Sequence, residues 1–190
     1  AGVWAPWKSG WYDNANDTVH WWVGVPTRGD GIRSEDGGLS LAAGQTVTVT
    51  DQFDADNPFT LVEGSPKVQR ASCVVTDRWN KPSLVWADLD RSQYTVTDGG
   101  HEVRFVTAAG TGCAGQDAAE NAVALTGSVY QVNWDVIAED GGKGVSGPGE
   151  YANEATVAIG GAVNVVDATA TRITSSGSAI AEPTRARGFN

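Results

Sequence analysis

The chain has 190 residues, of which 41% are hydrophobic and 19% charged, and its formal net charge is −10. Its length fits one large domain, or one domain with extensions. Because nucleic-acid phosphates and anionic lipid headgroups both attract Lys and Arg, this acidic balance argues against nucleic-acid and membrane-surface partners. We expect no membrane insertion, since no apolar run approaches the roughly 20 residues of a spanning helix. No signal peptide is recognisable, which suggests a mature or excised fragment.

Apolar and polar residues alternate with a period of two along most of the chain, which predicts strands. After an N-terminal strand around Lys8, the expected strands are 18–25, 45–53, 72–79, 92–98, 101–107, 127–138 and 151–159. The glycines of "TDGGHEV" (97–103) predict a hairpin, because glycine tolerates positive φ. We expect one helical turn at most, within 112–125. This pattern is typical of an all-β, antiparallel β-sandwich.

The end of the chain has a different composition. Residues 162–174 are compatible with one more strand, whereas 175–190 are rich in Ser, Gly and Pro and resemble a linker. We therefore predict one domain over 1–160 and a C-terminal extension or linker over 161–190. The extension would complete a sheet edge, latch onto a neighbouring domain or stay disordered.

The two cysteines, Cys73 and Cys113, each lie near strand-like sequence. In an acidic chain rich in Thr and Gly, we favour a disulfide between them and an exported protein. Two buried free thiols are the alternative. The run "CAGQ" (113–116) also fits the Cys-x-x-Gln of internal thioesters, although four residues are a weak match.

Three polar residues stand in otherwise apolar rows. Side chains alternate faces along a strand, so Asn153 shares the inward face with Tyr151 and Ala155, and Asp51 follows Val47 and Val49. Lys8 lies in the same way among the N-terminal tryptophans. Taken singly, Lys8 would be solvated, Asp51 would cap a turn and Asn153 would bind a loop.

Together these three residue types can form an amide between two side chains. A buried lysine has a lowered pKa, so its neutral amine can attack the carboxamide carbon of an asparagine and release ammonia. A buried carboxylic acid can polarise the carboxamide and carry the proton to the departing nitrogen. We therefore expect Asp51 to be buried and protonated at neutral pH.

The matching residues also resemble a family. The run "WKSGWYDNANDTVHWWVGVP" (7–26), then "VTVTDQF" (47–53) and "EYANEATV" (150–157), is similar to the Cna-type immunoglobulin-like domains of Gram-positive adhesins and pilins. The resemblance covers about residues 3–160 and is greatest to the collagen-adhesin type. It implies that Lys8 and Asn153 are cross-linked by an isopeptide bond and that Asp51 is the catalytic acid. The cysteines depart from the family pattern and would suit an actinobacterial exported protein.

Other candidate sites are weaker. Arg28, Gly29 and Asp30 form the tripeptide that integrins recognise, although three residues often match by chance. The acidic turn 54–57 has oxygen ligands suited to Ca²⁺ but lacks the rest of the loop pattern, so a solvated turn is preferred. We expect no metal and no cofactor.

The resemblance thus implies an extracellular, cell-wall-anchored adhesin domain of a Gram-positive bacterium. Its partners would be an extracellular protein or glycan and neighbouring domains of the same adhesin. A pilin or stalk module that only bears force, and a tryptophan-based carbohydrate-binding module, are the alternatives. Apart from a single autocatalytic cross-link, we expect no enzyme activity.

Overall fold

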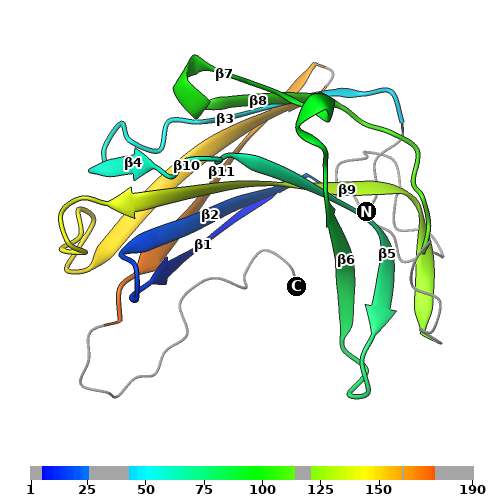
Figure 1. Cartoon of the computed structure of the whole chain (residues 1–190), viewed down its shortest axis with the longest axis horizontal. Coiled ribbons are helices and arrows are strands. Elements are labelled where there is room, and N and C mark those ends of the chain that lie inside the picture. Colours follow the sequence, from blue (N-terminus) through cyan, green and yellow to red (C-terminus); the bar gives the residue numbers. More distant parts are fainter. Residues whose placement is uncertain (1–5, 26–42, 114–120, 160, 174–190) are drawn as a thin grey trace.

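The computed structural model describes residues 6–25, 43–113, 121–159 and 161–173. They form two antiparallel sheets that pack together as a sandwich (Figure 1). The core joins side chains of both sheets, such as Val23 from one and Val49 from the other, each fully buried. The prediction of an all-β, immunoglobulin-like antiparallel sandwich is confirmed.

The first sheet has the strand order β1-β2-β9-β5-β6, and β4 also pairs with β9. Its strands are β1 (Trp7–Asp13), β2 (Thr18–Val25), β4 (Phe59–Leu61), β5 (Lys67–Thr76), β6 (Pro82–Asp88) and β9 (Ala122–Ala138). At its centre Trp21 of β2 lies opposite Trp134 of β9, and both are fully buried. This sheet places β1, which carries Lys8, at an edge.

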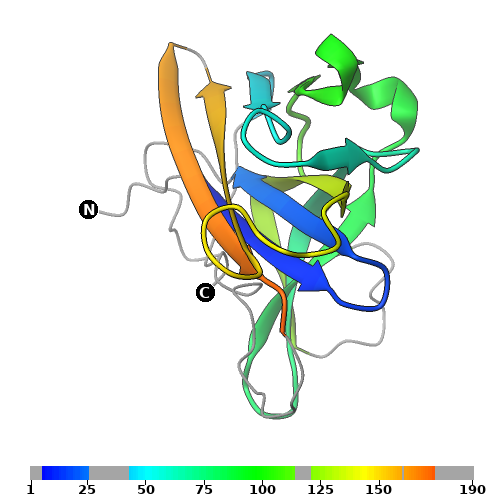
Figure 2. The ribbon, with the colours of Figure 1, turned by 90° about the vertical axis from the view of Figure 1, so that its left-hand side faces the viewer.

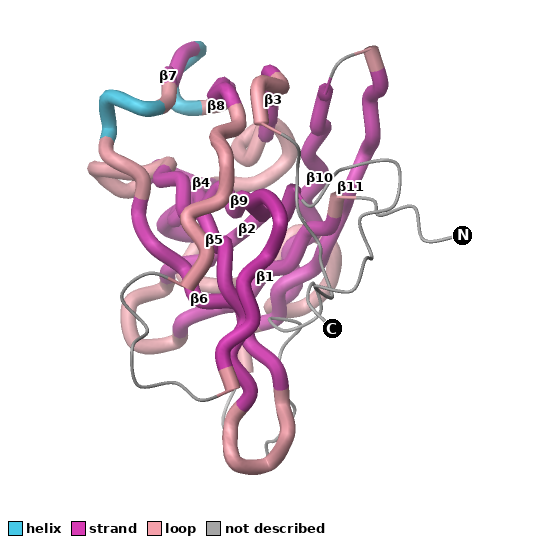
Figure 3. Tube along the Cα trace, turned by 90° about the vertical axis from the view of Figure 1, so that its right-hand side faces the viewer, coloured by secondary structure: helices cyan, strands magenta, loops and turns pink. Residues whose placement is uncertain are grey.

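The second sheet has the strand order β11-β10-β3-β8-β7. Its strands are β3 (Thr46–Asp51), β7 (Thr95–Thr97), β8 (Glu102–Val106), β10 (Glu150–Ile159) and β11 (Ala162–Thr171). The predicted hairpin is present, since β7 pairs with β8. Two short 3₁₀ turns, Arg91–Gln93 and Asp98–Gly100, flank β7 (Figure 3).

Two of the observed strands, β4 and β6, are not predicted from the sequence. β4 has only three residues, and β6 buries Leu84 alone among its seven residues, so neither shows a clear period of two. The sequence allows one helical turn at most within 112–125, and in the described part of this stretch 122–125 begin β9. Residues 114–120 lie outside the described residues.

Residues 162–171, assigned from the sequence to the C-terminal extension, form β11 and pair with β10 along its whole length. Of the alternatives for this extension, completing a sheet edge is the one observed for these residues. β11 also lies beside β1 of the first sheet, so the two sheets meet along this side (Figure 2). Residues 174–190 lie outside the described residues.

The β5–β6 hairpin extends away from the sandwich (Figure 1), and together with β9 it forms a second, smaller core of Ala71, Leu84, Leu125 and Val129. The register of β5 against β9 shifts between Ala71 and Cys73, where this second cluster begins. Cys73 is bonded to Cys113, so a disulfide ties β5 to the segment that follows β8. The base of the hairpin is therefore covalently held to the rest of the chain.

Candidate functional site

The fold brings Lys8, Asp51 and Asn153 into contact inside the sandwich. The Lys8 Nζ donates to Asp51 Oδ2 over 2.7 Å. The Asn153 Nδ2 donates to Asp51 Oδ1 over 2.9 Å and to Oδ2 over 3.1 Å. The carboxyl group thus stands between the amine and the carboxamide and touches both.

Strand parity explains why these three side chains point inward. In β3 the buried residues are Val47, Val49 and Asp51, and in β10 Asn153 is buried between exposed Ala152 and Glu154. The last β3–β10 pair is Asp51 opposite Ala155, so Asn153 lies just beyond it on the neighbouring strand. Lys8 reaches the same place from β1 in the opposite sheet.

All three side chains are shielded from water. The side chains of Lys8 and Asp51 have no exposed surface, and the exposed fraction of Asn153 is 8%. Burial lowers the pKa of the Lys8 amine, and the charge and hydrogen bond of Asp51 oppose that shift in part. Transfer of a proton from Lys8 to Asp51 would turn a buried ion pair into a neutral pair, which removes a desolvation cost of several kcal/mol per ion.

A tryptophan forms one wall of the site. The Lys8 Nζ lies 5.0 Å from the centroid of the Trp21 ring. Gly10, opposite Trp21 in the β1–β2 register, makes room for this ring, because a Cβ at Gly10 would lie 2.2 Å from a ring carbon. The sequence indicates tryptophans around Lys8 but does not single out Trp21. Only the pairing of β1 with β2 shows which ring faces the amine.

The site holds the three groups that amide formation requires. The Asp51 carboxyl group contacts both the Lys8 amine and the Asn153 carboxamide, and water is largely excluded. Within the described residues, no group of three or more His, Cys, Asp and Glu is placed to bind a metal ion. The side chains of the acidic turn after β3 contact protein groups. Asp54 contacts the ring of His101, and Asn57 donates to the carbonyl of Ala152.

The other residues that the sequence predicts as site residues do not belong to this triad. Cys73 and Cys113 are joined in a disulfide, which leaves no thiol at Cys113 for a thioester. Arg28, Gly29 and Asp30 lie outside the described residues.

The tryptophans of the described residues mostly serve packing. Trp21 and Trp134 are fully buried, and Trp11 stacks on His20 with ring centroids 5.2 Å apart. Trp79, in the β5–β6 turn, is 66% exposed and contacts the guanidinium of Arg78. The described surface therefore offers one strongly exposed tryptophan rather than a row, and this does not favour the carbohydrate-binding alternative.

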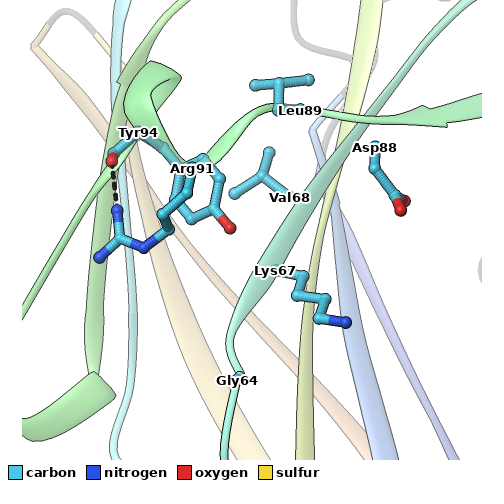
Figure 4. Close-up of a pocket in the computed structure, with 7 residues that line it drawn as sticks. All are labelled: Gly64, Lys67, Val68, Asp88, Leu89, Arg91 and Tyr94. Atoms are coloured by element: carbon cyan, nitrogen blue, oxygen red, sulfur yellow. Dashed lines mark hydrogen bonds between the residues drawn. The ribbon is translucent and has the colours of Figure 1, made fainter.

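A hollow of about 450 Å³ lies next to β5 and the end of β6 (Figure 4). Val68 and Leu89 contribute apolar surface, and Lys67 and Asp88 lie on one side of it. Arg91 donates to the carbonyl oxygen of Tyr94 over 2.7 Å, which holds its guanidinium on the other side. The hollow lies apart from the buried triad and shares no residue with it.

Comparison with known proteins gives likeness of fold only. No protein-family model and no curated protein matches the chain. Among solved structures it is similar to ACE19, the collagen-binding subdomain of the Enterococcus faecalis surface protein ACE, with 7% identity and a TM-score of 0.45, over 90% of this chain and 99% of that one.

Two further solved structures are similar at the same level. The group B streptococcus pilus 2b backbone protein has 16% identity and a TM-score of 0.44, over 86% of this chain and 55% of that one. The C-terminal domain of the Streptococcus agalactiae AgI/II polypeptide BspA has 10% identity and a TM-score of 0.43, over 88% of this chain and 50% of that one. The chain thus spans about half of each. Within the part of the chain that the structure describes, no helix is long and apolar enough to cross a membrane.

Proposed function

We propose that this chain is a self-cross-linking domain of a bacterial cell-surface adhesin or pilus-like protein, with an isopeptide bond between Lys8 and Asn153. The observation that supports the proposal is the buried contact of Asp51 with both the Lys8 amine and the Asn153 carboxamide. An isolated lysine, aspartate or asparagine is costly in a core, since buried charges and polar groups need partners. Their use as reactants gives a reason for placing all three at one point.

The proposed reaction begins with proton transfer from the Lys8 Nζ to Asp51. The neutral amine then attacks Cγ of Asn153 and forms a tetrahedral centre. Asp51 gives its proton to the departing Nδ2, and the Cγ–Nδ2 bond breaks as ammonia leaves. The attacking Nζ loses its second proton to Asp51 in the same collapse. The product is an amide between Nζ and Cγ, and Asp51 ends as the neutral acid, which holds the proton that the Lys8 ammonium brought to the site.

The fold supplies the rate enhancement. Holding reactants in place can lower a barrier by roughly 7–11 kcal/mol in favourable intramolecular cases. The lowered pKa of Lys8, which is caused by burial, increases the fraction of nucleophilic amine. The reaction occurs once per chain, so we propose no turnover on an external substrate.

The bond would suit a protein that stays attached under tension. It would join β1 of one sheet to β10 of the other, so a pulling force would act on a covalent link. Each hydrogen bond that otherwise resists the force contributes only about 1 kcal/mol net. The disulfide between Cys73 and Cys113 fits an oxidising, extracellular location, as expected for a Gram-positive surface protein. Attachment to an extracellular protein or glycan, and transmission of force between neighbouring domains, both belong to this proposal.

Intact mass spectrometry of the full chain tests the cross-link. We expect the wild type to be lighter than its sequence by one ammonia, after allowance for the disulfide, and fragmentation to find a peptide that joins Lys8 to Asn153. Lys8→Met should restore the full mass, whereas the matched control Lys67→Met, at an exposed lysine on β5, should stay cross-linked. A wild type with the plain sequence mass would refute the proposal.

A further inference from the structure

A hollow of about 400 Å³ opens beside Asn153 at the surface of the second sheet. It is lined by residues from three segments: the connection from β3 to β4, strand β10 and strand β11. The polar side chains among them are Gln52, Asp56, Asn57, Asn153, Glu154 and Asp167.

The hollow exists because the sheet opens at this point. β3 and β10 pair from Val47 opposite Ile159 to Asp51 opposite Ala155, and β3 then ends. The connection beyond Asp51 is joined to β10 by Asn57, whose Nδ2 donates to the carbonyl of Ala152 over 3.0 Å. A gap therefore remains next to Asn153.

Asn153 is the member of the triad that reaches this gap. Asn153 lines the hollow, whereas neither Lys8 nor Asp51 does. Asn153 is therefore the point at which the buried triad borders the hollow.

The charge around the hollow favours a cation. Glu154 of β10 lies directly opposite Asp167 of β11, and like charges in that position are destabilising. Asp56 adds a third carboxylate from the facing loop. Among the described residues no cationic side chain forms an ion pair with any of the three. Within the described part of the chain these three carboxylates do not form a metal-binding group.

We propose that this hollow is the exit through which the ammonia displaced from Asn153 leaves the protein. This inference rests on the proposed cross-linking function. When the Lys8 Nζ–Asn153 Cγ bond has formed and the Cγ–Nδ2 bond has broken, ammonia retained beside Cγ can add back and expel the Lys8 amine. Its departure into the hollow, where it takes a proton from water and becomes ammonium, prevents that return. Asp56, Glu154 and Asp167 act as positioning residues that draw ammonium outward.

The test follows cross-linking in freshly synthesised full-length chain by intact mass over time, with tryptophan fluorescence as a separate measure of folding. Ala55, an exposed residue that lines the hollow, is changed to Trp to fill it. We expect Ala55→Trp to fold like the wild type but to lose ammonia about tenfold more slowly, equivalent to about 1.4 kcal/mol in the barrier. The matched control Ala87→Trp, at an exposed alanine of β6, should cross-link at the wild-type rate.

A second variant tests the charge without adding bulk. Glu154→Gln with Asp167→Asn should slow cross-linking and weaken its salt dependence, since Asp56 alone keeps its charge. The wild type should slow as salt rises, because at about 1 M salt the Debye length falls to about 3 Å. Glu139→Gln, at an exposed glutamate outside the hollow, should behave as the wild type.

The outcomes separate the two proposals. Wild-type rates in both the Ala55→Trp and the charge-neutralised variants would overturn the exit while leaving the cross-link intact. A wild type that never loses ammonia would overturn the proposed function, and the exit with it. If Ala55→Trp fails to fold, the variant Glu154→Gln with Asp167→Asn tests the exit. A salt dependence equal to that of the wild type would overturn it.

Discussion

Asp51 is the residue on which the proposed chemistry depends most, because it contacts both reactants. Two other carboxyl groups, Asp135 of β9 and Glu154 of β10, are alternatives for this role. In the structure Asp135 binds the ring of His20, and Glu154 is exposed on the outward face of β10. Geometry therefore favours Asp51 among the three.

Replacing Asp51 should stop the reaction. Asp51→Asn keeps the shape without the proton carrier, and Asp51→Ala removes both. We expect folded protein in both cases, heavier than cross-linked wild type by one ammonia after allowance for the substitution, as measured by intact mass. Asp135→Asn serves as the control that still cross-links. Loss of ammonia by Asp51→Ala at the wild-type rate would show that the role belongs to another group.

The rate of cross-linking should depend on pH through Lys8. Burial lowers the pKa of the Lys8 amine, so a larger fraction is neutral at a given pH than for an exposed lysine. Lower pH reduces that fraction, and we expect the rate of mass loss to fall as the pH is lowered while the protein stays folded. Circular dichroism at each pH checks folding. A rate that rises on acidification would contradict the role of Lys8 as the nucleophile.

Gly10 should be intolerant of a side chain. A Cβ at this position would lie 2.2 Å from the Trp21 ring, which must then move away from Lys8. We expect Gly10→Ala to reduce the free energy of unfolding by about 1–3 kcal/mol, as overpacking does, and also to slow cross-linking. Denaturation and intact mass measure the two effects. Gly161→Ala, where an added Cβ meets nothing within 4 Å, is the control.

At the scale of elements, the pairing of β2 with β9 includes a cross-strand ion pair. The Nδ1 of His20 lies 2.8 Å from Asp135 Oδ1, and its Nε2 lies 3.7 Å from Asp13 Oδ2. The hydrogen bond to Asp135 outweighs partial burial and raises the pKa of His20 above its ordinary value of 6.5. The protonated ring is thus favoured in the folded state.

This pair predicts a pH dependence of stability. The pKa of His20 is higher in the folded than in the unfolded state. The contribution of this ion pair to the free energy of unfolding is therefore complete below about pH 6.5 and is lost as pH rises through the folded pKa. We expect the free energy of unfolding to decline over that window more in the wild type than in His20→Phe, which keeps a ring against Trp11. Denaturant titrations at several pH values measure it. Parallel curves for the two proteins would contradict the assignment.

The disulfide stabilises the connection between β5 and the end of β8. Cys73 and Cys113 are 40 residues apart, and the chain-entropy model gives roughly 3–4 kcal/mol for such a loop. We expect the double variant Cys73→Ser with Cys113→Ser to lose about that much in denaturant unfolding. The comparison is made in an Asn153→Ala background, so that the isopeptide bond does not hold the chain together. An unchanged midpoint would show that the disulfide adds no stability.

At the scale of the whole molecule, the proposed bond would close a ring from Lys8 to Asn153. The ring contains every strand from β2 to β9 and the disulfide, whereas β11 lies outside it. A pulling force on the two ends would therefore separate β11 from β10, then residues 154–159 of β10 from β3, and would stop at the covalent link.

Stretching single molecules should show this limit. We expect cross-linked wild type to extend only by the chain outside positions 8 and 153, at about 3.3–3.6 Å per residue. Asn153→Ala should release the whole sandwich, apart from the loop that the disulfide closes. Equal extensions in the two proteins would show that the link does not carry the force.

The amino-acid sequence by itself determined the strand class and the inward rows that hold Lys8, Asp51 and Asn153. A period of two is a local property, since successive side chains of a strand point to opposite faces whatever the strand pairs with. Strand 18–25 was therefore predicted with the bounds that β2 has. Short strands such as β4 and edge strands such as β6 carry too little of this pattern to be recognised.

Only the tertiary structure decided which of these side chains meet. The contact of Lys8 with Asp51 joins residues 43 positions apart, and that of Asn153 with Asp51 joins residues 102 positions apart. Such contacts depend on the strand order in each sheet and on how the sheets stack, neither of which periodicity encodes. The wall formed by Trp21, the place of β11 at the sheet edge and the hollow beside Asn153 follow from that order. They arise where strands pair or stop pairing, which is a property of the assembled sheets.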